Sequence, residues 1–260
     1  MARLIEFKNK EDELLRGIID DAESDRAVVF VHGFEGTTIA TRFKNFVDRL
    51  KGKVVLFRFD FAGVGLSDGD FSDMTIEKSV NDLNIAIETL KKETGVKNIE
   101  LVAHSLGGVI SAVYAKSHSS SIHKMVLLAP ALNQKELNRF WYAQSSNKES
   151  AVTWQNYQDY LNEDAFQEFC NENRMAKEHY LKNDYIREVE GVDYQIQLSE
   201  ELAHKIMIIH GSNDGRVPLE SNNQLPSDIL ILKVENGDHK LARPDMVEKY
   251  LNQSIEFLER

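Results

Sequence analysis

Three side chains of this sequence, a serine, an aspartate and a histidine, have the types and the order of a nucleophile, an acid and a base. The serine stands in Ala103-His104-Ser105-Leu106-Gly107-Gly108, between an apolar run and a helical pattern. A strand that turns tightly into a helix around a serine needs small residues two positions away, and it leaves the hydroxyl exposed. The start of the helix also places backbone N–H groups beside that hydroxyl. We therefore expect Ser105 to be a nucleophile.

A serine nucleophile needs a base, and the base needs an acid that orients it. Asp214 follows an apolar run that ends at His210, and His239 follows the last such run and is the only histidine after Asp214. In proteins with this type of turn, the acid and then the histidine come after the serine. Asp238 is a competing acid, but a residue adjacent to the histidine is poorly placed to orient its ring. The expected catalytic residues are Ser105, Asp214 and His239.

The tetrahedral intermediate of acyl transfer carries an oxyanion, which two hydrogen-bond donors must stabilise. One expected donor is the backbone N–H of Leu106, directly after the serine. The other is the N–H of Phe34, in a loop that follows an apolar run, where Gly33 lets the backbone approach closely. The single cysteine, Cys170, excludes an intrachain disulfide and a multi-cysteine metal site. We expect neither a metal nor a cofactor.

Alternating strands and helices must position these residues. Short apolar runs rich in Val, Ile and Leu predict eight strands, at Leu4–Phe7, Leu14–Ile19, Ala27–His32, Val54–Phe59, Ile99–Ala103, Lys124–Leu128, Lys205–His210 and Ile229–Val234. Helical patterns lie between or after them, at Ile39–Leu50, Thr75–Lys92, Leu106–Ser117 and Asp245–Leu258. This alternation predicts a mostly parallel sheet flanked by helices, with the first two, more polar strands as a hairpin at one edge.

The segment 132–204 breaks this rhythm, because none of its 73 residues belongs to a convincing strand. A structureless loop of that length is unusual inside a compact domain. Tyr157–Phe169 and Asn171–Tyr180 have the pattern of amphipathic helices. We therefore expect an inserted helical cap at 132–204, carried by a core that comprises 1–131 and 205–260.

The composition of this segment suggests what the cap would do. It holds 11 of the chain's 23 aromatic residues, so it predicts an apolar substrate pocket. The candidate walls of that pocket are Trp141, Trp154 and Tyr157. The segment also contains 14 acidic and 7 basic residues, and this negative charge disfavours anionic substrates such as phospholipids and acyl-CoA.

The charge of the whole chain excludes further classes of partner. The net charge is −11, from 31 Lys and Arg against 42 Asp and Glu, and no local basic cluster offsets it. Nucleic acids and membranes are therefore not expected partners. We find no signal peptide and no transmembrane pattern, so the expected location is the cytoplasm. A homodimer through the cap or an edge strand is compatible with the sequence.

The motifs together resemble the α/β-hydrolase superfamily over essentially the whole chain. Asp60-Phe61-Ala62-Gly63-Val64-Gly65-Leu66-Ser67-Asp68-Gly69 and Leu127-Leu128-Ala129-Pro130-Ala131 are most similar to the carboxylesterases that include feruloyl (cinnamoyl) esterases. Those enzymes usually have glycine where Ala103 stands. The resemblance implies an α/β-hydrolase fold with a helical insertion over the acyl pocket. Haloalkane dehalogenases and epoxide hydrolases are similar too, but they have aspartate at the position of Ser105.

The expected function is hydrolysis of short-to-medium acyl or aryl esters, through an acyl-enzyme, with a small-molecule ester as the substrate. A thioesterase, a monoacylglycerol lipase, a carbon–carbon bond hydrolase or a serine peptidase would use the same three residues, and the sequence leaves these open. An alternative from a different functional class is a non-catalytic α/β-hydrolase that binds a small ligand. Such proteins usually lack one of the three residues, and all three are present here.

Overall fold

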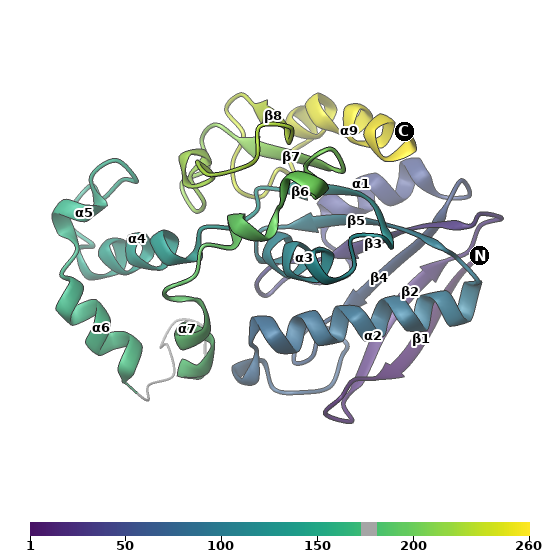
Figure 1. The fold of residues 1–260 in the computed structure, drawn as a ribbon, viewed down its shortest axis with the longest axis horizontal. Helices are drawn as coiled ribbons and strands as arrows, with labels where there is room; N and C mark the ends of the chain where they lie inside the picture. The colour runs from purple at the N-terminus through teal and green to yellow at the C-terminus, as the bar shows by residue number, and fades with distance from the viewer. Residues whose placement is uncertain (173–180) are drawn as a thin grey trace.

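The computed structural model describes residues 1–172 and 181–260, and these contain an eight-stranded, twisted sheet (Figure 1). Its strands are β1 (Ala2–Lys8), β2 (Leu14–Asp20), β3 (Arg26–Val31), β4 (Val55–Asp60), β5 (Asn98–His104), β6 (Ile122–Leu128), β7 (Ile206–Gly211) and β8 (Leu230–Val234). They lie in the order β1-β2-β4-β3-β5-β6-β7-β8. The hairpin of β1 and β2 is antiparallel and β2 pairs antiparallel with β4, whereas all other pairs are parallel. The predicted mostly parallel sheet with an edge hairpin is confirmed.

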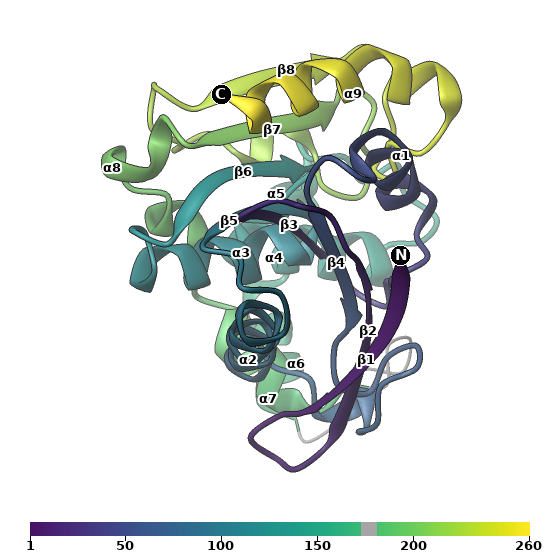
Figure 2. The same cartoon turned by 90° about the vertical axis from the view of Figure 1, so that its right-hand side faces the viewer.

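Helices cover both faces of the sheet (Figure 2). One face packs against α1 (Thr41–Leu50) and α9 (Pro244–Glu259), and the other against α2 (Ile76–Thr94) and α3 (Leu106–Ser117). Along β3, Val28 and Phe30 belong to the first of these cores, and Val29 and Val31 to the second. Because successive residues of a strand point to opposite faces, a strand buried on both faces has a continuous apolar sequence.

Between β6 and β7, all regular elements among the described residues are helical. They are α4 (Gln134–Ser146), α5 (Tyr157–Tyr160), α6 (Glu163–Asn171), α7 (Asn183–Val189), α8 (Glu200–Ala203) and the 3-10 turn η2 (Tyr194–Gln197). We call residues 132–172 and 181–204 the insertion; its helices α4 to α7 lie together beside the sheet (Figure 1). The helix predicted at 157–169 is divided in two because Asn162 caps α6, accepting a hydrogen bond from the N–H of Ala165 at 3.0 Å.

Of the helix predicted at Asn171–Tyr180, residues 173–180 lie outside the described residues. Two further 3-10 turns, η1 (Phe71–Asp73) and η3 (Leu219–Ser221), occur in the loops of the core. No helix among the residues that the structure describes is long and apolar enough to cross a membrane.

The insertion is joined to the core at the start of α2. Both carboxylate oxygens of Glu188, on α7, accept hydrogen bonds from backbone N–H groups of α2, from Ile76 at 2.6 Å and from Glu77 at 2.8 Å. The N–H of Lys182 donates to the carbonyl of Ser72 at 2.9 Å. The first N–H groups of a helix lack partners within the helix and favour a negative charge. Glu188 therefore ties α7 to the core.

Candidate active site

The turn between β5 and α3 holds Ser105 in a backbone conformation that L-residues rarely adopt, with φ of 54° and ψ of −119°. Its N–H donates to the carbonyl of Leu128 at 2.9 Å, and its carbonyl accepts from the N–H of Gly108 at 2.9 Å. A Cβ atom at Gly107 would overlap the backbone carbonyl of Val31, so only glycine fits there. The predicted strained turn around the serine is therefore present.

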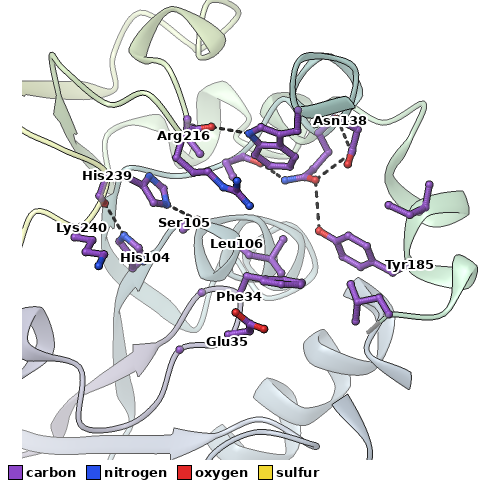
Figure 3. A pocket seen from close by; sticks show the side chains of 18 of the residues that line it. Phe34, Glu35, His104, Ser105, Leu106, Asn138, Tyr185, Arg216, His239 and Lys240 are labelled. Atoms are coloured by element: carbon purple, nitrogen blue, oxygen red, sulfur yellow. Dashed lines mark hydrogen bonds between the residues drawn. The ribbon is translucent and has the colours of Figure 1, made fainter. Parts of the chain in front are cut away.

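The structure brings the three expected catalytic side chains together from the ends of three strands, and Figure 3 shows two of them, Ser105 and His239. The Nε2 atom of His239 lies 3.0 Å from the Oγ atom of Ser105. The Nδ1 atom of the same ring lies 2.8 Å from Oδ2 of Asp214. Asp238, the competing acid, instead accepts a hydrogen bond from the N–H of Leu241 at 3.0 Å within its own turn. Asp214 is thus the acid in contact with the histidine ring.

Several donors surround the carboxylate of Asp214, whose side chain is fully buried. Its Oδ1 accepts from the backbone N–H groups of Arg216 and Val217 at 2.9 and 2.8 Å. Burial opposes its ionisation, but hydrogen bonds from His210, His239 and the N–H of Val217 outweigh burial and hold the pKa of this carboxyl well below its usual range. An ionised Asp214 keeps a proton on Nδ1 of His239 and leaves Nε2 to accept the serine proton.

Two further histidines position the loops of the site. The Nε2–H of His104 donates to the carbonyl of His239 at 2.9 Å, and the two rings lie 4.9 Å apart. The Nδ1–H of His32 donates to the carbonyl of Gly33 at 2.9 Å, while its Nε2 accepts from the N–H of Phe61 at 3.2 Å. Burial lowers the pKa of both rings, for His104 well below 6.5, so both act as neutral donors.

His210 was not expected to be part of the site. Its side chain is fully buried, its Nε2 lies 3.4 Å from Oδ2 of Asp214, and that nitrogen also donates to the carbonyl of Val217 at 2.8 Å. His210 therefore supports the same carboxylate that orients His239. The sequence feature that could have identified His210 is its position as the last but one residue of β7, because catalytic groups gather at the ends of parallel strands.

The loop after β3 lies directly against the nucleophile. A Cβ atom at Gly33 would come 2.8 Å from the carbonyl oxygen of His104 and 3.0 Å from Cβ of Ser105, so the loop can approach only because this residue is glycine. Phe34 and Leu106, whose backbone N–H groups are the expected oxyanion donors, line the same pocket as Ser105. The structure thus places both expected donor residues beside the serine.

The buried carboxylate of Asp60 connects this loop to the glycine-rich run that follows β4. Its Oδ1 accepts from the N–H of Thr38 at 2.7 Å, and its Oδ2 accepts from the N–H of Leu66 at 3.0 Å. Gly65, with φ of 59°, makes room for the carboxylate. The Asp60–Gly69 motif is therefore a support for the loop that carries Phe34.

A pocket of about 390 Å³ opens at Ser105. Trp141, on α4, lines it as expected, but Trp154 and Tyr157 are not among the described residues that do. Their rings instead pack against Phe140, with centroids 5.4 and 5.8 Å away, in the interior of the insertion. The prediction that Trp154 and Tyr157 form pocket walls is therefore wrong, because these aromatic side chains build the insertion's own core.

The polar wall that the insertion contributes was not found from the sequence. The hydroxyl of Tyr185 donates to Oε1 of Gln134 at 3.5 Å, and Nδ2 of Asn138 donates to the carbonyl of Gln134 at 2.7 Å. In the parts of the chain that the structure describes, no three His, Cys, Asp or Glu side chains are grouped to hold a metal ion. The remaining lining residues are Glu35, Gly36, Arg42, Ala131, Leu181, Ile186, Arg216, Val217 and Lys240.

Solved structures share this fold. Est1E from Butyrivibrio proteoclasticus, solved with ferulic acid bound, has a TM-score of 0.75 and 18% sequence identity, covering 98% of this chain and 100% of that chain. The esterase Pf2001 from Pyrococcus furiosus has a TM-score of 0.71 and 17% identity, covering 100% of this chain and 91% of that chain. At these identities the likeness concerns the fold, and it confirms the expected α/β-hydrolase architecture.

Sequence relatives give the family. Putative esterase/lipase 2 of Mycoplasma genitalium is 25% identical over 243 residues, which are 89% of this chain and 88% of that protein. A probable 1-acylglycerol-3-phosphate O-acyltransferase of Oryza sativa is 30% identical over 129 residues, so the match spans 48% of this chain but only 31% of that relative. The family model described as serine aminopeptidase, S33, matches residues 22–230, which include Ser105 and Asp214. The chain therefore belongs to the serine aminopeptidase, S33 family of α/β-hydrolases.

Proposed function

We propose that this hydrolase is a serine carboxylesterase for short-to-medium acyl or aryl esters, with Ser105 as nucleophile, His239 as base and Asp214 as orienting acid. The observation that carries the proposal is the unbroken chain of hydrogen bonds from Asp214 through His239 to Ser105. The chain ends at a strained serine that opens into a pocket. A nucleophile within hydrogen-bond distance of an oriented base is the arrangement that acyl transfer requires.

In the first half of the reaction, Oγ of Ser105 attacks the ester carbonyl while its proton passes to Nε2 of His239. The carbonyl oxygen becomes an oxyanion, which accepts hydrogen bonds from the backbone N–H groups of Phe34 and Leu106. Leu106 is the first residue of α3, where a backbone N–H has no acceptor within the helix. His239 then donates the proton to the leaving alcohol, and an acyl-enzyme remains on Ser105.

In the second half, water replaces the alcohol. His239 takes a proton from the water as it attacks the acyl carbonyl, and returns the proton to Oγ of Ser105 as the carboxylic acid leaves. Asp214 stabilises the imidazolium that forms in both halves. The net reaction is the addition of one water to one ester, which yields one acid and one alcohol.

The size and lining of the pocket support substrates of modest length. Its volume of about 390 Å³ lies near the lower end of typical small-molecule pockets. Apolar side chains from both the core and the insertion line it, among them Phe34, Leu106, Trp141, Leu181 and Ile186. We propose that residues 132–204 act as a cap over a core of residues 1–131 and 205–260, because α4 and α7 complete the wall opposite the strand ends.

The test is hydrolysis of p-nitrophenyl esters from acetate to palmitate, with methyl ferulate as an aryl ester. The wild type is compared with Ser105→Ala and with Ser120→Ala, a matched control on the exposed loop before β6. We expect rates that peak at short or medium acyl chains, a loss of about 10⁴-fold or more in Ser105→Ala, and no change in Ser120→Ala.

Labelling with a fluorophosphonate probe separates the remaining outcomes. Labelling of the wild type but not of Ser105→Ala, without ester hydrolysis, would indicate a serine hydrolase other than an esterase. Aminoacyl p-nitroanilides would then test for peptidase activity. Absence of both labelling and hydrolysis in a folded protein would contradict the proposal and leave a ligand-binding protein.

A further inference from the structure

The charges that line the pocket are opposite in sign to those of the whole chain. The net charge is −11, yet three of the four formally charged side chains that line the pocket among the described residues are cations: Arg42, Arg216 and Lys240. The fourth, Glu35, makes no ion pair with any of the three in the part of the chain that the structure describes. The described residues that line the pocket thus carry a local excess of positive charge, although the chain as a whole is negative.

Arg216 has a backbone that two hydrogen bonds hold in place and a guanidinium group without a carboxylate partner among the described residues. Its N–H donates to Asp214 at 2.9 Å, and its carbonyl accepts from Nε1 of Trp141 at 2.7 Å. The guanidinium lies over the ring of Trp141, with Cζ 5.3 Å from the ring centroid, and forms no hydrogen bond or ion pair within the described residues. In Figure 3 this side chain extends into the pocket between His239 and Asn138. A guanidinium carries five N–H donors, which a molecule bound in this pocket could meet.

Lys240 and Arg42 add positive charge on the other side of the histidine. Lys240 follows His239 directly and lines the pocket, and its carbonyl accepts from Nε of Arg42 at 2.9 Å. Burial lowers the pKa of Arg42, and the nearby carboxylate of Asp238 opposes this shift, although no carboxylate bonds to the Arg42 guanidinium within the described residues. An anionic group in the pocket would stabilise this partly buried cation further.

The chemistry of the leaving group decides which part of the substrate these cations meet. His239 donates its proton to the leaving alcohol, so the groups that flank His239 face the alcohol portion of the ester. Arg216 and Lys240 lie on either side of His239 (Figure 3). The apolar lining residues Leu181, just before α7, and Ile186, on α7, come from the opposite wall and face the acyl portion. The two portions of the substrate therefore meet walls of different chemistry.

We propose that the substrates are esters whose alcohol portion carries a carboxylate or phosphate group, bound by Arg216 and attracted by the charge of Lys240, while an uncharged acyl group occupies the apolar side. This inference rests on the proposed esterase function and names its substrate class. Hydrolysis then releases two products. One is a carboxylic acid whose chain carries no other charge, and the other is an alcohol that carries the carboxylate or phosphate group. Arginine suits such a group because its planar guanidinium forms two parallel hydrogen bonds with a carboxylate or phosphate.

The experiment compares three butyryl esters that differ in one group of the leaving phenol. The phenols are 4-hydroxybenzamide, which is neutral, 4-hydroxybenzoate and 4-hydroxyphenyl phosphate. Each kcat/KM is divided by the rate of hydrolysis in hydroxide, which removes the difference in leaving-group reactivity. We expect the wild type to prefer at least one of the two anionic esters by about 10-fold at low salt, the effect of one charge-assisted hydrogen bond. The carboxylate and phosphate arms show which anion fits.

Variants identify the residues that cause the preference for anionic esters. Arg216→Gln is expected to remove most of the preference and Lys240→Gln part of it, whereas Lys92→Gln, an equal charge change on the exposed side of α2, keeps it. Equal rates for the three butyryl esters in the wild type would overturn the inference while the esterase stands. A preference for mono-4-nitrophenyl succinate over 4-nitrophenyl butyrate would place the anion on the acyl portion and also overturn it. No hydrolysis of any ester would overturn both proposals.

Discussion

The side of the pocket built from strand ends and the side built from α4 and α7 are held in place by different interactions. At the strand ends, buried polar groups bond to backbone atoms of neighbouring loops, as Asp60 does with Thr38 and Leu66 and as His104 does with the carbonyl of His239. Inside the insertion, aromatic side chains pack against one another around Phe140 of α4, and Glu188 attaches α7 to α2 through hydrogen bonds from backbone N–H groups. Fixed backbone contacts suit groups that must be held within fractions of an ångström, whereas packed side chains are exchanged at lower cost.

The largest effect should come from disturbing the strand-end side. In Gly33→Ala, the added methyl group meets the carbonyl of His104 and Cβ of Ser105, and moves the loop that carries the N–H of Phe34. We expect kcat/KM to fall by about 10²-fold, the cost of one misplaced oxyanion donor. Gly191→Ala is the matched control, because no atom lies near the added methyl group there. Equal rates in the two variants would contradict the strict geometry that we assign to the strand-end side of the pocket.

A smaller effect is expected in the insertion, where two tryptophans should behave differently. Trp141 lines the pocket, so Trp141→Ala should raise KM by about 10-fold and shift the preferred acyl length. Trp154 packs within the insertion, so Trp154→Ala should lower the free energy of unfolding by about 1–3 kcal/mol and leave the acyl-length profile unchanged. Kinetics across an ester series and denaturant unfolding measure both quantities. An altered profile in Trp154→Ala would show that the pocket reaches further than the lining residues indicate.

The smallest effect concerns the attachment between the two regions. Glu188→Gln replaces the carboxylate that accepts from two N–H groups of α2 by a neutral amide with a single acceptor oxygen. We expect the free energy of unfolding to fall by about 1 kcal/mol and the amides of α7 to exchange faster with solvent. Glu201→Gln, on the exposed side of α8, serves as the control. Unchanged exchange in α7 would mean that apolar packing alone attaches the insertion.

The same difference explains which features could be predicted from the sequence. The strands β5 and β7 are buried on both faces and have apolar sequences, and the loops after them contain Ser105 and Asp214. His239 follows the edge strand β8, which is mostly exposed but still apolar in sequence, so both the sheet and these three residues were found. Spacing in the insertion shows which residues share a helix face but not what that face meets. For this reason Trp141 and Trp154 could not be told apart, and a sum of charges could not reveal the cations beside His239.

The backbone of Ser105 has a consequence for how the protein would respond to selection. A non-glycine residue with φ of 54° costs on the order of 1–3 kcal/mol, which the rest of the fold must offset. That cost places the nucleophile but contributes nothing to stability, so activity and stability oppose each other at this one position. A screen for thermal tolerance alone would favour chains that relax the turn and lose the reaction. Improvement of this hydrolase by directed evolution therefore requires that turnover be selected together with stability.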